Sequence, residues 1–61
     1  MKNIEVTFTA DIAVVTISSE SEFTVRRMRK TAALVWMYKQ GLKWSWSKTE
    51  DGLEQATWSR G

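Results

Sequence analysis

Alternating apolar and polar residues at the start of the chain predict β-strands. Every second position of residues 4–8 is apolar, which is typical of a strand with one buried face and one wet face. The pattern breaks near Asp11, and residues 12–17 are then apolar on both faces. We therefore predict a hairpin that turns near Asp11. Because this turn has no Asn-Gly or Asp-Gly pair, one long bent strand over residues 2–18 is the alternative.

The segment that follows has helical spacing. A polar break at residues 18–22 precedes it, and good helix formers continue to Gln40. Thr24 is the predicted N-cap and Gly41 the predicted left-handed C-cap. One stripe about 100° wide collects the apolar residues that should cover the sheet. These residues are Val25, Met28, Ala32, Val35 and Trp36.

A second hairpin is predicted after the helix. Residues 42–46 and 56–58 alternate between apolar and polar, and Gly52 can supply the positive φ of the turn between them. Three tryptophans, Trp44, Trp46 and Trp58, then share one face of this hairpin. We expect that face to be core. The alternative is an exposed aromatic face that binds single-stranded nucleic acid or anchors an interface.

These elements give an α+β fold in the order ββαββ. One amphipathic helix is expected to pack on a four-stranded, mostly antiparallel sheet, in a single small domain of residues 1–61. This order, with a Trp-x-Trp strand at residues 44–46, resembles the immunoglobulin-binding domains of streptococcal protein G. The resemblance implies the architecture, and we transfer no binding residues from it.

The composition argues against catalysis. The chain has 61 residues, no Cys and no His, so it lacks the usual general base, thiol nucleophile and nitrogen or sulfur metal ligands. Its carboxylate pairs, at residues 20 and 22 and at residues 50 and 51, lie in polar segments that should be solvated loops. We therefore expect no enzymatic activity, no cofactor and no metal site. A chain this short buries only about 60% of its unfolded surface, so its core is marginal.

The expected location is the cytoplasm. Residues 1–5 lack the features of a signal peptide, and the absence of Cys removes any sign of an oxidising compartment. The longest apolar run, residues 32–38, is far shorter than the roughly 20 residues that span a bilayer, so no membrane association is expected. Short chains of this kind are common among phages and mobile elements, and we expect such an origin from size alone.

Four cations occur between residues 26 and 30, although the chain carries a net charge of only +2. At the start of a helix they would face the positive end of the macrodipole, at a cost of about 0.3–1 kcal/mol each. Either upstream Glu20 and Glu22 balance them on a solvated face, or an acidic partner docks there. That partner would be a phosphate backbone or a protein patch.

An apolar group lies on the far side of the predicted helix, next to these cations. A single helix buries only one side on a sheet, so an apolar far side indicates a contact surface unless irregular chain covers it. We therefore predict a small regulatory or inhibitory protein that binds a larger protein through the outer helix face, with a sheet edge as a further candidate surface. A nucleic-acid binder using Arg26 to Lys30 is the alternative, and a homodimer seam is a third option. The predicted partner-binding residues are Arg26, Arg27, Lys30, Leu34, Met37 and Tyr38.

Overall fold

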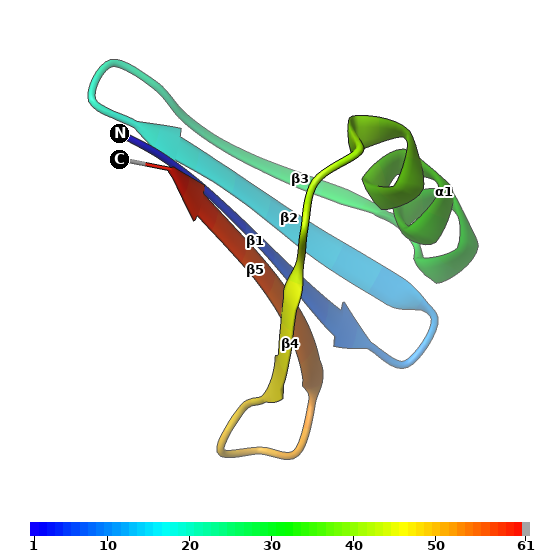
Figure 1. Cartoon of the computed structure of the whole chain (residues 1–61). Coiled ribbons are helices and arrows are strands. Elements are labelled where there is room, and N and C mark those ends of the chain that lie inside the picture. Colours follow the sequence, from blue (N-terminus) through cyan, green and yellow to red (C-terminus); the bar gives the residue numbers. More distant parts are fainter. Residues whose placement is uncertain (61) are drawn as a thin grey trace.

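Five strands and one helix make up residues 1–60, the part of the chain that the computed structural model describes (Figure 1). The fold is α+β, as predicted, but the sheet has one more strand than the sequence indicated. The elements are β1 (Lys2–Thr9), β2 (Ile12–Ser19), β3 (Phe23–Arg29), α1 (Lys30–Gln40), β4 (Ser45–Lys48) and β5 (Glu54–Arg60).

The strands form one antiparallel sheet in the order β3-β2-β1-β5-β4. β1 and β2 are a true hairpin with Thr9 opposite Ile12, so the single bent strand is excluded. Ala10 in the turn has φ 53°, a left-handed conformation that glycine adopts freely but that carries a steric cost for alanine. The pairing of β1 with β5 joins the two ends of the chain, and the additional strand β3 before the helix makes the order βββαββ in place of the predicted ββαββ.

The second hairpin is confirmed. β4 pairs with β5 with Lys48 opposite Glu54, and the loop between them closes on Thr49. The backbone N–H of Gly52, at φ 82°, donates to the Thr49 carbonyl, and the Leu53 N–H donates to the Thr49 hydroxyl at 3.1 Å. The positive φ predicted for Gly52 is therefore present in this turn.

The helix begins later than predicted. Residues 23–29 form strand β3, so Thr24 lies inside a strand and does not cap a helix. Phe23, Thr24 and Val25 favour strands, and β2 offers them a seven-row ladder of paired residues from Ser18↔Phe23 to Ile12↔Arg29. That pairing outweighs the helix preference of the Arg and Met residues that follow. The predicted C-cap is present, because Gly41 has φ 64° and its N–H donates to the Tyr38 carbonyl.

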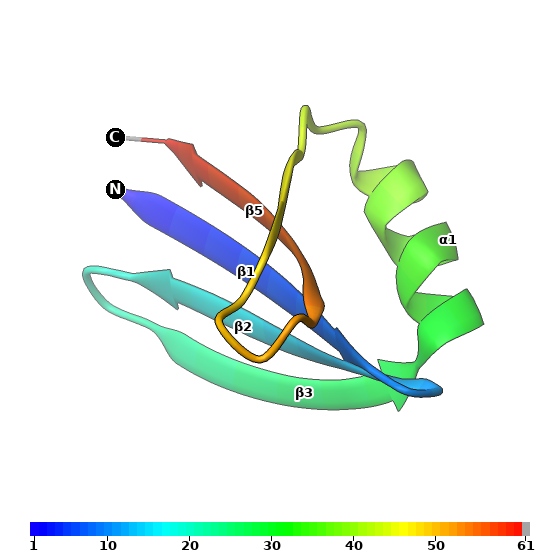
Figure 2. The same ribbon diagram turned by 90° about the horizontal axis from the view of Figure 1, so that it is seen from below.

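The core lies between the helix and one face of the sheet (Figure 2). β1 contributes the central apolar row, and its neighbours β2 and β5 add smaller buried side chains. The helix α1 covers this face of the sheet with Ala33 and Met37. The sheet curls at its β4 end, so that Trp46 stacks on Phe8 of β1 with ring centroids 5.8 Å apart. The buried residues are Ile4, Val6, Phe8, Ala13, Val15, Ala33, Met37 and Ala56.

The side that the helix buries overlaps with the predicted stripe only at Trp36, which packs against the core. Ala33 and Met37 face the sheet, whereas Val35, placed in the predicted core stripe, is 53% exposed. Val25 and Ala32 of that stripe are also exposed, and Met28 packs against the core from β3 instead of from the helix. Because the helix starts six residues after Thr24, strand geometry and not helical phase places residues 25 and 28.

The tryptophans divide between core and surface. Trp44 and Trp58 pack against the core, and the Trp44 indole N–H donates to the Met37 carbonyl at 3.3 Å. Trp36 is half-buried, with its ring 6.2 Å from that of Trp44. Trp46 remains 53% exposed. The predicted Trp face is therefore core except at its β4 edge.

No helix in residues 1–60 has the length and apolar character needed to cross a membrane.

Replacing Met37 with Ala should destabilise the fold by roughly 2–5 kcal/mol, because it opens a cavity under the helix. Val35→Ala is the matched control, since Val35 is exposed on the same helix and Ala has the higher helix propensity. Urea titration followed by circular dichroism measures both changes. Equal effects, or a larger loss for Val35→Ala, would show that the helix is oriented differently.

Candidate protein-interaction surfaces

An apolar strip runs along the solvent side of α1. Leu34, Val35 and Tyr38 lie there at relative positions i, i+1 and i+4, and they are 41%, 53% and 88% exposed. Val35 and Tyr38 share the side of exposed Thr31 and face away from Ala33 and Met37, and Leu34 lies at the border beside Met37. We call Leu34, Val35 and Tyr38 the helix surface. No segment of residues 1–60 covers Tyr38.

The predicted surface is corrected at one of its apolar positions. Met37 is only 4% exposed and belongs to the core, so it cannot reach a partner in the folded state. Val35 takes its place on the helix surface. The prediction assigned Val35 to the core and Met37 to the surface because it assumed a helix starting at Thr24. The core stripe of that longer helix was centred on the wrong angle.

The basic cluster lies mostly on a strand. Arg26, Arg27 and Arg29 are exposed residues of β3, and only Lys30 lies in the first turn of the helix. The predicted macrodipole penalty therefore applies to Lys30 and not to the whole cluster. Lys30 is half-buried, and its Nζ lies 5.8 Å from the centroid of the Phe8 ring, in cation–π geometry.

The cations and the apolar helix residues do not form one surface. Cross-strand partners share a face, and Arg26 is opposite core residue Val15, so it points to the helix side of the sheet. Arg27 is opposite Val14 and Arg29 opposite Ile12, so both point to the open side, away from α1. The predicted surface, on which the apolar helix residues lie next to the cations, is therefore divided, because Arg27 and Arg29 lie on the other side of the sheet from the helix.

The backbone of β3 is open along one edge. Ser19 donates its N–H to the Glu22 carbonyl and Lys30 donates its N–H to the Asp11 carbonyl, both at 2.8 Å. Ser19 with Glu22, and Asp11 with Lys30, are therefore hydrogen-bonded pairs of directly opposed residues at the two ends of the ladder. Such pairs alternate along an antiparallel ladder, so Thr24, Arg26 and Met28 direct their N–H and C=O groups to β2. The same groups of Phe23, Val25 and Arg27 consequently point away from the sheet.

The open face of the sheet is polar at its centre. The Gln55 side-chain amide donates to the Glu5 carboxylate at 2.7 Å and to the Thr7 hydroxyl at 3.0 Å, which links β5 to β1. Towards β3 the same face becomes apolar and basic, where Phe23 and Val25 accompany Arg27. The sequence predicted one wet face of the first strand, but not this change of character across the sheet.

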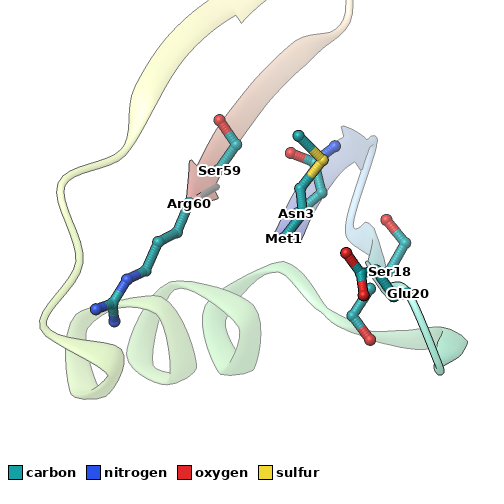
Figure 3. Close-up of a pocket in the computed structure, with 7 residues that line it drawn as sticks. Met1, Asn3, Ser18, Glu20, Ser59 and Arg60 are labelled. Carbon is teal, nitrogen blue, oxygen red and sulfur yellow. The ribbon is translucent and has the colours of Figure 1, made fainter.

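A hollow of about 590 Å³ opens where the ends of β1, β2 and β5 meet (Figure 3). Its charged groups do not converge, because Arg60 points away from Glu20. Residues 1–60 also contain no cluster of His, Cys, Asp or Glu suited to a metal ion. The hollow is lined by Met1, Asn3, Ser18, Ser19, Glu20, Ser59 and Arg60.

Comparison of the chain with family models, with curated proteins and with solved structures finds no match. Function is therefore inferred from the helix surface and from the exposed residues of β3.

Amide hydrogen exchange should reveal the open edge. The N–H groups of Val25 and Arg27 should exchange at least roughly a hundredfold faster than those of Thr24 and Arg26, because only the second pair is bonded to β2. Residue-resolved exchange measured by NMR tests this alternation. Uniform protection along β3 would mean that its outer edge is covered.

Proposed function

We propose that this chain is a small, non-enzymatic regulatory or inhibitory protein that binds a larger protein through the helix surface. The observation that carries the proposal is the exposure of three large apolar side chains, Leu34, Val35 and Tyr38, on one side of an 11-residue helix. Because these side chains stay in water, they contribute little hydrophobic free energy to a domain whose core is already small. A partner that covers the group recovers the hydrophobic free energy.

Tyr38 is the proposed anchor. Tyrosine combines a large apolar ring with a hydroxyl that can form a hydrogen bond, and it is enriched among the residues that dominate binding energy. The flanking Leu34 and Val35 provide the water-excluding contacts around it. Because Ala33 and Met37 hold the opposite side of the helix against the sheet, this surface is presented on a rigid element.

We further propose that the protein is cytoplasmic, because it lacks cysteine, and that it comes from a phage or another mobile element, because it is small. A second copy of the chain is an alternative occupant of the helix surface. Light scattering distinguishes a dimer that uses this surface from a monomer that binds a different protein.

Nucleic-acid binding is the second candidate. The observation that favours it is the exposure of Arg26, Arg27 and Arg29 along one strand. None of them takes part in the side-chain hydrogen bonds found within residues 1–60. The net charge of +2 and the neighbouring Phe23 and Val25 fit a protein partner better than a phosphate backbone.

Tyr38→Ala should lower the affinity for the partner by about 2 kcal/mol, or roughly thirtyfold, while the melting temperature changes little. The partner is first isolated from nuclease-treated host lysate with the tagged chain, and its affinity is then measured by calorimetry. Lys43→Ala, at an exposed position outside the helix, is the control. Retained affinity with an intact fold would remove Tyr38 from the interface.

Single-stranded DNA should bind weakly at physiological salt, because three arginines can neutralise only a few phosphates. If these arginines are the contacts, the logarithm of the binding constant should fall with the logarithm of salt concentration with a slope near −2, from about −0.7 per phosphate. Fluorescence anisotropy of a labelled oligonucleotide measures this slope. Tight binding with a much steeper slope would put the nucleic-acid function first.

A further inference from the structure

We infer that the outer edge of β3 is a docking site for an acidic, extended segment of the protein partner, which adds to the sheet as another strand. The inference deepens the proposed function and rests on its claim that the partner is a protein. It concerns a surface separate from the helix surface, so the two can be tested independently. Phe23, Val25, Arg27 and Arg29 define this surface, which we call the β3 edge.

The backbone provides the binding groups. Phe23, Val25 and Arg27 direct N–H donors and C=O acceptors away from β2, with the two-residue repeat that an antiparallel strand matches. β3 is the last strand on its side of the sheet and has seven residues. The edge at the other side, β4, has only four. The β3 edge is therefore the longer of the two places where another strand could pair.

The side chains specify the chemistry of that strand. Phe23, Val25, Arg27 and Arg29 all point to the open face, apolar at the first two positions and cationic at the last two. An antiparallel segment directly opposite them would need acidic residues beside Arg29 and Arg27, and apolar residues beside Val25 and Phe23. Cross-strand pairs of opposite charge and apolar pairs are each favourable in a sheet.

Charge makes a second copy of the chain a poor occupant. Two β3 edges pairing in antiparallel fashion would bring their arginines close together, and cationic edge residues are a common defence against such self-association. A phosphate backbone would satisfy the arginines but would leave the outward C=O groups and the exposed Phe23 and Val25 without partners. An acidic polypeptide strand satisfies all three kinds of group.

The direct test is titration with the end-blocked peptide Glu-Thr-Glu-Thr-Val-Thr-Val. Its Glu residues fall opposite Arg29 and Arg27, and its Val residues fall opposite Val25 and Phe23. We expect saturable binding, with exchange of the Val25 and Arg27 amides slowed at least about tenfold at saturation. A peptide with Lys in place of Glu should bind at least about tenfold more weakly.

Methylation of the peptide backbone separates strand pairing from simple charge attraction. A methyl on the nitrogen of the first Val removes an N–H that faces β3, and should weaken binding about tenfold or more. A methyl on the nitrogen of the middle Thr removes an N–H that points away from β3, and should have a much smaller effect. Equal effects of the two methyl groups would overturn the inference.

A protein variant gives the complementary test. Val25→Pro removes an outward N–H and leaves the bonds to β2 in place, which is the position where an edge strand tolerates proline. It should abolish peptide binding, whereas Val25→Thr should retain it. If Val25→Pro does not fold, the methylated peptides still decide the question.

Three results would refute the β3 edge as a docking site. The first is the absence of peptide binding at millimolar concentration, and the second is unchanged binding by folded Val25→Pro. The third is competition by an oligonucleotide that displaces the peptide at lower concentration without protecting the Val25 amide. Tyr38→Ala should bind the peptide normally, so failure of the helix surface and failure of the β3 edge are distinguishable.

Discussion

The central position of β1 is the constraint on which the rest of the structure depends. It is paired along both edges, with β2 and with β5, so both neighbours must match its buried apolar row. Val6 shows the consequence, because it is fully buried between Val15 on one side and Ala56 on the other. The small side chains of the neighbours leave room for the helix, which buries Ala33 and Met37 in the core and packs Trp36 against it.

The two hairpins could be predicted because their signals are local. Period-two alternation marked the strands, and Gly52 marked one turn. Strand β3 could not be predicted in this way, since Arg26 to Arg29 have good helix preference and read as part of a helix. What decides their conformation is pairing with the preceding strand β2, whose outer edge accepts seven paired residues. The strand ladder overrode the helix preference of the individual residues.

That one error accounts for the mistakes at the candidate site. A helix starting at Thr24 placed the arginines beside Tyr38, whereas the strand directs Arg27 and Arg29 to the opposite side of the sheet. The same shift exchanged the roles of Val35 and Met37. The exposure of Leu34 and Tyr38 was predicted, because an apolar excess on a single helix over one sheet cannot all be buried. Open backbone groups along β3 leave no trace in composition or periodicity, so only the pairing pattern revealed them.

The pairing of β1 with β5 also sets the order in which the nascent chain can fold. Strands β1, β2 and β3 pair with neighbours in sequence, so this three-stranded meander can form as soon as residues 2–29 have left the ribosome. Its β1 side then exposes an unpaired backbone until residues 54–60 arrive to cover it. During that interval the future centre of the sheet is itself an edge. A chain released before Glu54 keeps that edge, with the apolar residues of β1 beside it, and is exposed to aggregation through an edge that β5 covers in the finished fold.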